Sequence, residues 1–270
     1  MLKVKGVSKI FNAGTPHEIR ALEHIDLEIK KGEFVVVIGT NGSGKSTLLN
    51  AIAGTFPVDS GTIHIGGHDV TLQPEYVRAR CIGRVFQNPF LGTAPNMTIA
   101  ENMVLAARRG RRRGLGWALK GDLIKDCQEK LRSLNLGLEE RHQNIIGSLS
   151  GGQRQSLTLI MATWLKPDLL LLDEHTAALD PKSAERVIHL TKEIIARYEL
   201  TTLMVTHSMH QAANLGERLI MMYKGRIIHD FKGAEKKRLR VDDLLDRFEE
   251  VRREGLLDVS AAELLRRMYV

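Results

Sequence analysis

The sequence predicts an α/β fold in which a parallel sheet carries helices on both faces. Segments 34–38 and 169–172 are continuously apolar, and in 201–205 three apolar residues follow two threonines, so all three are expected to be strands buried on both faces. Between the last two lies a stretch with helical periodicity, marked by Val187 and Ile194. Strands that alternate with helices in this way favour a parallel sheet covered on both sides.

The segments around this sheet predict two further subdomains. Near the N-terminus, residues 2–7 and 19–29 are expected to form strands and 61–67 a hairpin, so we expect an antiparallel β subdomain. The chain between about 88 and 160 is rich in helix formers and nearly free of strand signals, which predicts an inserted helical subdomain. Residues 1–230 are therefore expected to form one domain.

Residues 231–270 are expected to form a helical extension docked on this domain. An apolar stripe on one charged helix consists of Leu244, Leu245, Phe248 and Val251. A capping box formed by Ser260 and Glu263 is expected to open a final short helix.

Composition predicts an ordinary soluble protein of a reducing compartment. Of 270 residues, 43% are hydrophobic and 26% charged, and no apolar run approaches the about 20 residues of a membrane span. The N-terminus shows no signal-peptide core. The two cysteines, Cys81 and Cys127, form no CxxC pair, which argues against a disulfide framework and a zinc site.

The formal net charge of +7 leaves several kinds of partner open. Part of the excess positive charge lies in an arginine-rich segment, residues 108–113. This segment could be a solvated loop, contact lipid headgroups or contact an acidic partner. No aromatic residues interleave with these arginines to stack bases, so nucleic acid is not an expected partner.

One glycine-rich segment matches the phosphate-binding pattern GxxxxGK[ST]. It consists of Gly39, Thr40, Asn41, Gly42, Ser43, Gly44, Lys45 and Ser46, followed by Thr47. The segment lies between a buried strand and an apolar-faced helix, so backbone N–H groups at a helix N-terminus would surround phosphates. Lys45 would reach the outer phosphates, and the Ser46 hydroxyl would ligate Mg²⁺. The sequence therefore predicts a nucleotide and Mg²⁺ site here.

Two carboxylates follow the apolar segment 169–172. In α/β sheets ligands bind beyond the carboxyl ends of the strands, so Asp173 and Glu174 should emerge beside the glycine-rich segment. Asp173 would hold Mg²⁺, and Glu174 would act as general base towards a water molecule. The alternative is a buried strand followed by a solvated acidic turn.

A third motif points to a family. Leu149-Ser150-Gly151-Gly152-Gln153 resembles the signature of ABC ATPases, and its serine stands 23 residues before Asp173. Further landmarks are similar to those of the family: Gln87 to the Q-loop glutamine, Asp180 in Ala178-Leu179-Asp180 to the D-loop, His207 to the switch histidine, and Phe11 to the aromatic that stacks on adenine. The resemblance covers residues 1 to about 230 and implies a P-loop NTPase with a RecA-like parallel sheet core.

The resemblance implies a site shared between two chains, with ATP bound between them. The signature residues Ser150, Gly151 and Gly152 would contact the γ-phosphate held by the glycine-rich loop of a second subunit, and Gln153 would belong to the nucleotide-binding residues. Asp180 would also belong to the nucleotide-binding residues. His207 would hydrogen-bond the γ-phosphate and orient Glu174, and Gln87 would touch the metal or the water. A homodimer with two competent sites is expected, although pairing with a different cassette stays open.

Two positions depart from the family pattern. His175 replaces the proline that most often follows the catalytic glutamate, and Phe11 replaces a tyrosine. Both carboxylates remain, so activity is expected to survive. Phe11 keeps the face that would stack on adenine, and its alternative interpretation is a core phenylalanine on an early strand.

The resemblance implies an ATP-hydrolysing subunit that powers an ABC transporter through ATP-driven dimerisation. Residues 88–102 would face a transmembrane permease and so hold the chain, on the cytoplasmic side, at the inner face of the cell membrane. Residues 96–102 and the arginine-rich segment after them resemble cassettes of amino-acid importers, which implies a separate solute-binding protein. The alternative is a soluble ABC ATPase acting on ribosomes or DNA. Such proteins usually carry two cassettes or a long coiled-coil insertion, and neither is visible here.

Overall fold

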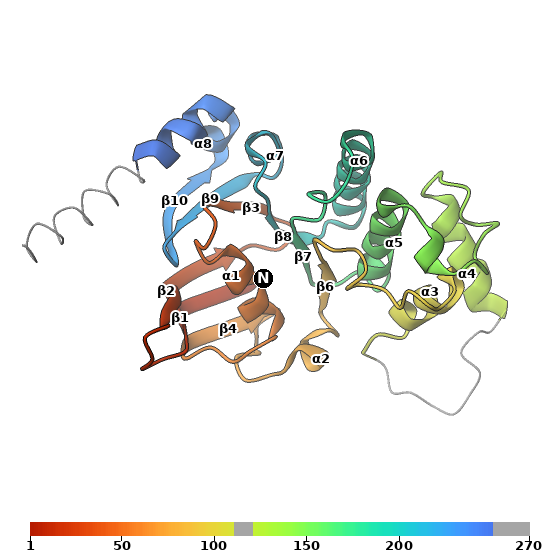
Figure 1. Ribbon diagram of the computed structural model, residues 1–270, viewed down its shortest axis with the longest axis horizontal. Coiled ribbons are helices and arrows are strands. Elements are labelled where there is room, and N and C mark those ends of the chain that lie inside the picture. Colours follow the sequence, from red (N-terminus) through yellow and green to blue (C-terminus); the bar gives the residue numbers. More distant parts are fainter. Residues whose placement is uncertain (111–120, 251–270) are drawn as a thin grey trace, which may run out of the picture.

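The computed structural model describes residues 1–110 and 121–250, and it confirms the predicted α/β fold (Figure 1). A six-stranded sheet in the order β10-β9-β3-β8-β7-β6 forms the core. Its strands are β3 (Phe34–Gly39), β6 (Ile82–Val85), β7 (Leu169–Asp173), β8 (Thr201–Val205), β9 (Arg218–Tyr223) and β10 (Arg226–Lys232). The strands from β9 to β6 are parallel, whereas β10 pairs antiparallel with β9. The predicted parallel sheet thus has an antiparallel edge strand.

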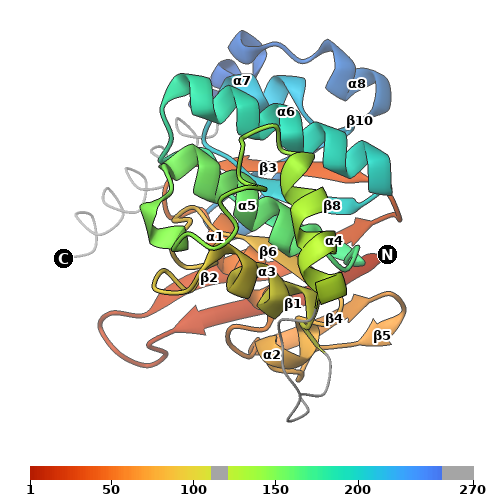
Figure 2. The same cartoon turned by 90° about the vertical axis from the view of Figure 1, so that its right-hand side faces the viewer.

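The central strands are buried on both faces, which explains why β3 and most of β7 are continuously apolar in sequence. On β3, Val35 contacts one layer of the core and Val36 the other, because successive side chains point to opposite faces. The first layer contains α1 (Lys45–Ala53) and the antiparallel sheet, and the second contains α5 (Gly151–Thr163), α6 (Pro181–Tyr198) and α7 (Met209–Asn214). In Figure 2, α5 and α6 lie in front of the strands.

A four-stranded antiparallel sheet in the order β2-β1-β4-β5 confirms the predicted β subdomain. Its strands are β1 (Leu2–Phe11), β2 (Ile19–Ile29), β4 (Ser60–Ile65) and β5 (His68–Asp69). The first strand continues past its predicted end at Val7. A bulge near Gly6, whose φ is 56°, lets its pairing with β2 resume up to Phe11.

Along the chain, the inserted helical subdomain comes between β6 and β7, as the sequence predicts. It contains α3 (Ile99–Ala107), α4 (Gly121–Arg132), the 3-10 helix η1 (Ile146–Ser148) and the start of α5, and the single-turn helix α2 (Glu75–Arg78) precedes β6. The helices α3 and α4 of this subdomain are seen in Figure 2. Thr98 and Glu101 begin α3 with a reciprocal capping box. The division into a domain of residues 1–230 and an extension of residues 231–270 stays a prediction.

The arginine-rich segment is partly buried where the structure describes it. Arg109 donates a hydrogen bond to the backbone oxygen of Ala162 on α5, 3.0 Å away. The interpretation as a solvated loop therefore does not hold for Arg109. Residues 111–113 lie outside the described residues.

The part of the chain after β10 packs on the core. The helix α8 (Gly233–Arg238) is followed by a helical stretch over 241–250, where Leu244 is fully buried and Phe248 packs against the same core cluster. The other members of the predicted stripe and capping box are exposed (Leu245) or lie outside the described residues (Val251, Ser260 and Glu263). Within residues 1–110 and 121–250, no helix has both the length and the apolar character needed to cross a bilayer.

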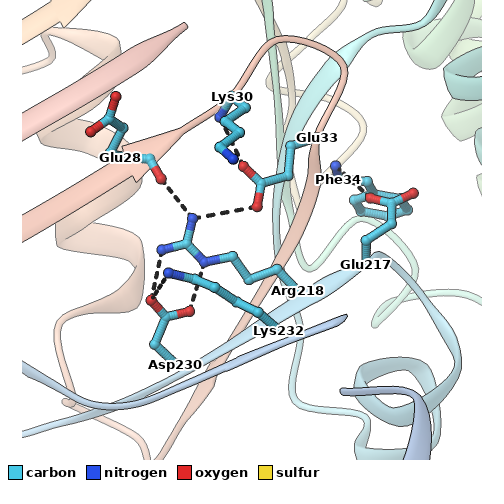
Figure 3. Close-up of polar contacts among 8 residues, drawn as sticks. All are labelled: Glu28, Lys30, Glu33, Phe34, Glu217, Arg218, Asp230 and Lys232. Atoms are coloured by element: carbon cyan, nitrogen blue, oxygen red, sulfur yellow. Dashed lines mark hydrogen bonds and ion pairs between the residues drawn. The ribbon is translucent and has the colours of Figure 1, made fainter. Parts of the chain in front are cut away.

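A buried arginine joins the two sheets (Figure 3). Arg218 donates two hydrogen bonds to the Asp230 carboxylate, at 2.6 and 2.7 Å, and one to the Glu28 backbone oxygen at 2.6 Å. Glu33, on the turn between β2 and β3, lies 3.4 Å from the same guanidinium, and only 7% of the Arg218 side chain is exposed. These contacts tie β9 and β10 to the end of β2 and thereby fix the position of the antiparallel sheet.

Candidate functional site

The glycine-rich loop connects β3 to α1 at the carboxyl end of the core sheet. Gly44 is the N-cap of α1 with a φ of 97°, and a Cβ at this position would lie 2.4 Å from the Ala21 backbone oxygen. Gly39 is equally confined, because a Cβ there would lie 2.4 Å from the Met222 backbone oxygen. Both positions therefore require glycine, and the loop can follow its tight path only with these residues.

The N-terminus of α1 is suited to receive an anion. The described residues give this helix no side-chain cap and no acidic residue in its first turn, so its N–H groups and dipole attract negative charge. Lys45 is buried, and its ammonium donates to the Gly39 and Thr40 backbone oxygens at 3.0 and 2.9 Å. Burial lowers the pKa of Lys45, and the Glu174 and Asp173 carboxylates oppose that shift.

A cavity of about 380 Å³ opens beside this loop. Its wall combines residues 41–47 of the loop with Phe11, Glu174 and His207. The Phe11 ring meets the Phe56 ring edge to face, with centroids 5.3 Å apart, and stays half-exposed towards the cavity. The structure thus brings the loop, the predicted adenine-stacking aromatic, the predicted base and the predicted switch histidine around one space.

Asp173 ends β7 next to the loop. Burial raises the pKa of its carboxyl group, and the neighbouring Glu174 adds to that shift. The positive charges of Arg84 and Lys45 act in the opposite direction. The Arg84 guanidinium lies 3.9 Å from the Asp173 carboxylate. The two cations favour the ionised carboxylate, which is the form that ligates a metal ion.

Glu174 leaves the strand in a left-handed backbone conformation. Its φ is 45°, and its N–H donates to the Val205 backbone oxygen at 3.0 Å. The Glu174 side chain lines the cavity, where one carboxylate oxygen lies 2.5 Å from Nε2 of His207. The two residues therefore form a pair that can orient and deprotonate a water molecule inside the cavity.

His175, directly after Glu174, is fully buried. Its Nε2 lies 3.1 Å from the Thr191 hydroxyl on α6, and that hydroxyl donates to the Val187 backbone oxygen at 2.7 Å. Because the hydroxyl proton is already used, the hydrogen-bond network assigns the donor role to His175 Nε2. Burial lowers the pKa of His175 to about 4. The sequence marks His175 as unusual but carries no signal for Thr191.

The signature segment lies at the start of α5. Ser150 is the N-cap of this helix, and it exchanges hydrogen bonds with Gln153 at 3.1 and 3.3 Å. Gly152 allows α5 to approach α6 closely, since a Cβ there would lie 2.7 Å from the Ser183 side chain. Ser150 and Gly151 are exposed, and none of the described residues that line the cavity belongs to the signature. One chain alone does not bring signature and cavity together.

Gln87 and Asp180 also lie outside the cavity wall. Gln87 is exposed and follows β6 by two residues. Asp180 is the N-cap of α6, and its carboxylate accepts a hydrogen bond from the Ser183 N–H at 3.0 Å. Their contacts with metal, water and nucleotide stay predictions.

Residues 22–177 match the protein family described as ABC transporter. The chain is 44% identical over 251 residues to a Clostridioides difficile protein named tyrosine transport ATP-binding protein, covering 92% of this chain and 99% of that protein. It is 34% identical over 233 residues to methionine import ATP-binding protein MetN 1 of Bacillus licheniformis, covering 84% of this chain and 66% of that protein. It also resembles the dimeric post-hydrolysis structure of the ATP-binding cassette MJ0796 bound to ADP and Pi. The TM-score is 0.73 at 33% identity, with 86% of this chain and 98% of that chain covered.

Proposed function

This chain belongs to the ABC transporter family, and we propose that it drives the uptake of an amino acid with an aromatic side chain. As a member it is an ATP-binding and ATP-hydrolysing subunit, and cassettes of this family form ATP-driven dimers. Relatives named for tyrosine transport and methionine import support an amino-acid importer. The relative named for tyrosine transport carries the proposal, because the similarity spans 99% of that protein at 44% identity.

ATP would bind with its phosphates in the loop of residues 39–47 and its adenine against Phe11. The uncapped N-terminus of α1 supports the phosphate position, because its N–H groups have no side-chain acceptor. The Lys45 ammonium would exchange its contacts with loop carbonyls for contacts with the outer phosphates. The half-exposed Phe11 ring at the cavity wall supports stacking on the base.

Mg²⁺ fits the donors at the end of β7 and in the first turn of α1. Asp173 offers a carboxylate oxygen and Ser46 a hydroxyl oxygen, which are ligands of the kind that Mg²⁺ prefers. No group of three or more His, Cys, Asp or Glu side chains able to hold a metal occurs among the described residues. This suits an ion that takes its other ligands from phosphates and water, with Gln87 near the metal or the water. When bound, Mg²⁺ neutralises charge on the phosphates.

Glu174 and His207 would carry out the hydrolytic step. Glu174 takes a proton from the attacking water while the water oxygen bonds to the γ-phosphorus. The bond from that phosphorus to the β–γ bridging oxygen breaks, which yields ADP and inorganic phosphate. The contact between His207 Nε2 and the Glu174 carboxylate supports these roles, because it holds the base inside the cavity. His207 would also donate to the γ-phosphate.

A second copy of the chain would complete each site. Ser150 and the N–H groups of Gly151 and Gly152 stand exposed or half-exposed at a helix N-terminus, which favours an anion from outside the chain. Gln153 fixes this helix start through its capping box, and Asp180 would lie at the same interface. A chain that carries both halves of the site supports a homodimer.

Permease subunits would hold the chain at the inner, cytoplasmic face of the membrane, and a separate solute-binding protein would deliver the substrate. Residues 88–102 are the proposed permease contact. Three exposed apolar side chains in or near this segment, Phe90, Leu91 and Leu105, support a protein interface.

Uptake into vesicles tests the substrate class. The chain is purified with its permease, reconstituted with ATP on the cassette side, and supplied on the other side with the solute-binding protein and labelled tyrosine. We expect ATP-dependent accumulation that unlabelled phenylalanine suppresses more strongly than methionine does, and that Glu174→Gln abolishes. Uptake that prefers a sugar or a metal ion would contradict the proposal, as would isolation of the chain on ribosomes without a permease.

A further inference from the structure

Arg84 places a largely buried positive charge beside the carboxylate that is proposed to hold the metal. It lies on β6, opposite Leu171 of β7 and therefore close to the end of that strand. Only 12% of its side chain is exposed. Its Nη2 atom lies 3.9 Å from the Oδ2 atom of Asp173. No phosphate-binding or signature motif includes this residue.

The other contacts of Arg84 fasten it to α1 and to the turn that follows. Nη2 donates to the Asn50 side-chain oxygen at 2.5 Å, and Nη1 donates to the Thr55 hydroxyl at 3.2 Å. Glu75 lies 3.4 Å from Nη1, and the Phe86 ring covers one face of the guanidinium with its centroid 4.4 Å from Cζ. Because α1 begins at the phosphate-binding loop, Arg84 links that loop's helix to the end of β7.

A stabilising role alone does not explain the burial of Arg84. The Nε atom of Arg84 is buried and finds no acceptor among the described residues. A buried polar group without a partner costs about 1–3 kcal/mol. Apolar side chains in place of buried ion pairs are often neutral or stabilising. The buried guanidinium is therefore better explained by a role in the neighbouring nucleotide site.

We propose that Arg84 is a positioning residue that holds Asp173 in the orientation needed for the metal ion of the nucleotide site. The ion pair between the guanidinium and Oδ2, at 3.9 Å, would favour one orientation of the carboxylate. Groups that pair with a metal-binding carboxylate from behind fix its orientation and are commonly needed for full metal affinity. The inference rests on the proposed Mg²⁺ site and adds to it a residue that acts through Asp173.

Manganese binding measures this role without turnover. In a Glu174→Gln background with saturating ATP, Mn²⁺ is titrated and followed by electron paramagnetic resonance. Arg84→Met removes the charge and its hydrogen bonds, and its Mn²⁺ affinity should fall by about tenfold or more, as is typical of lost outer partners. Arg84→Lys keeps the charge and should recover part of the affinity. ATP affinity in EDTA should stay unchanged in both.

Arg218→Met is the matched control. Arg218 is also buried and paired with a carboxylate, but it lies at the junction of the two sheets. This variant should lose stability and keep its Mn²⁺ affinity. Equal losses of Mn²⁺ affinity at Arg84 and Arg218 would reveal a general structural effect and overturn the proposal. Unchanged or tighter Mn²⁺ binding in Arg84→Met would overturn it as well.

Asn50→Ala keeps the test decisive should Arg84→Met fail to fold. It removes the acceptor that orients the guanidinium while the charge remains, so Mn²⁺ affinity should again fall, and an unchanged affinity would overturn the proposal. A different failure is also recognisable. If the Glu174→Gln background itself bound no Mn²⁺ with ATP, this would contradict the proposed metal site and, with it, the role of Arg84.

Discussion

At the scale of single residues, His175 is held inside the protein as a neutral imidazole directly after the proposed base. Its Nε2–H donates to Thr191, while Nδ1 finds no partner among the described residues. Protonation would place an unpaired positive charge in the core, and for that reason the pKa falls to about 4. A buried, neutral histidine that donates to α6 therefore anchors the backbone next to Glu174.

Stability should depend on pH through this residue. Between pH 6.5 and pH about 4 the unfolded chain binds a proton at His175 that the folded chain does not, so acidification lowers the free energy of unfolding. The full difference corresponds to about 3 kcal/mol. His175→Gln keeps a donor for Thr191 and cannot titrate, so its urea unfolding should lose less stability between pH 7 and pH 5 than the parent does. Equal losses in the two chains would contradict this explanation.

The residues that sequence reasoning predicted are those whose chemistry is local. The glycine-rich loop and the pair Asp173–Glu174 are short runs, and the residue types in such runs already indicate phosphate and metal chemistry. Arg84, Thr191 and Ser183 act through partners that are far away in the sequence. Those contacts exist only after strands and helices have packed, so no local pattern marks them.

At the scale of elements, the contact between α5 and α6 determines where the signature lies. Gly152 sits against Ser183 in the first turn of α6, and a Cβ at Gly152 would lie 2.7 Å from both the Cβ and the Oγ of Ser183. The start of α5, with Ser150 as its N-cap, is thereby positioned by α6. The helix that follows Asp180 and the helix that carries the signature are thus packed against each other at their first turns.

Gly152→Ala should displace the start of α5. Overpacking of this kind costs about 1–3 kcal/mol, and it would move Ser150 from the position proposed for the γ-phosphate of a second copy. In a Glu174→Gln background, ATP-driven dimerisation measured by light scattering should weaken by about tenfold, which is about 1.4 kcal/mol. Ser183→Gly in the same chain removes the clash and should restore most of the dimer. No restoration would show that the contact is not the cause.

Elements with a continuous apolar run were predictable from the sequence, and those that depend on tertiary pairing were not. The central strands β3, β7 and β8 are buried on both faces, which leaves a clear pattern. The antiparallel direction of β10 and the extension of β1 to Phe11 depend on which strand lies beside each. The burial of Arg109 against α5 likewise depends on packing.

At the scale of the whole molecule, two sheets must keep a fixed relation, because Phe11 on one sheet and the loop after β3 on the other line the same cavity. Arg218 joins them through Asp230, Glu33 and the Glu28 backbone oxygen (Figure 3). The antiparallel sheet also shares a core cluster with one face of the central sheet. Contacts at the ends of the strands away from the glycine-rich loop thus help to hold the two sheets together.

Arg218→Met should destabilise the chain without changing the loop. Loss of one partner from a buried ion pair costs about 3–5 kcal/mol, and because the Asp230 side chain is 32% exposed we expect a smaller loss of about 2 kcal/mol. Urea unfolding measures that loss, and nucleotide titration should show unchanged ATP affinity. A loss within about 0.5 kcal/mol, which is usual for surface substitutions, would contradict a joining role.

The Ser150 end of one copy is proposed to complete the nucleotide site of another. Light scattering of the Glu174→Gln variant in saturating ATP tests it most directly. The variant should show twice the chain mass of 30.2 kDa, and adding Ser150→Arg should return it to a single chain mass while ATP affinity is retained. A Glu174→Gln, Ser150→Arg chain that still dimerises with ATP would contradict the claim.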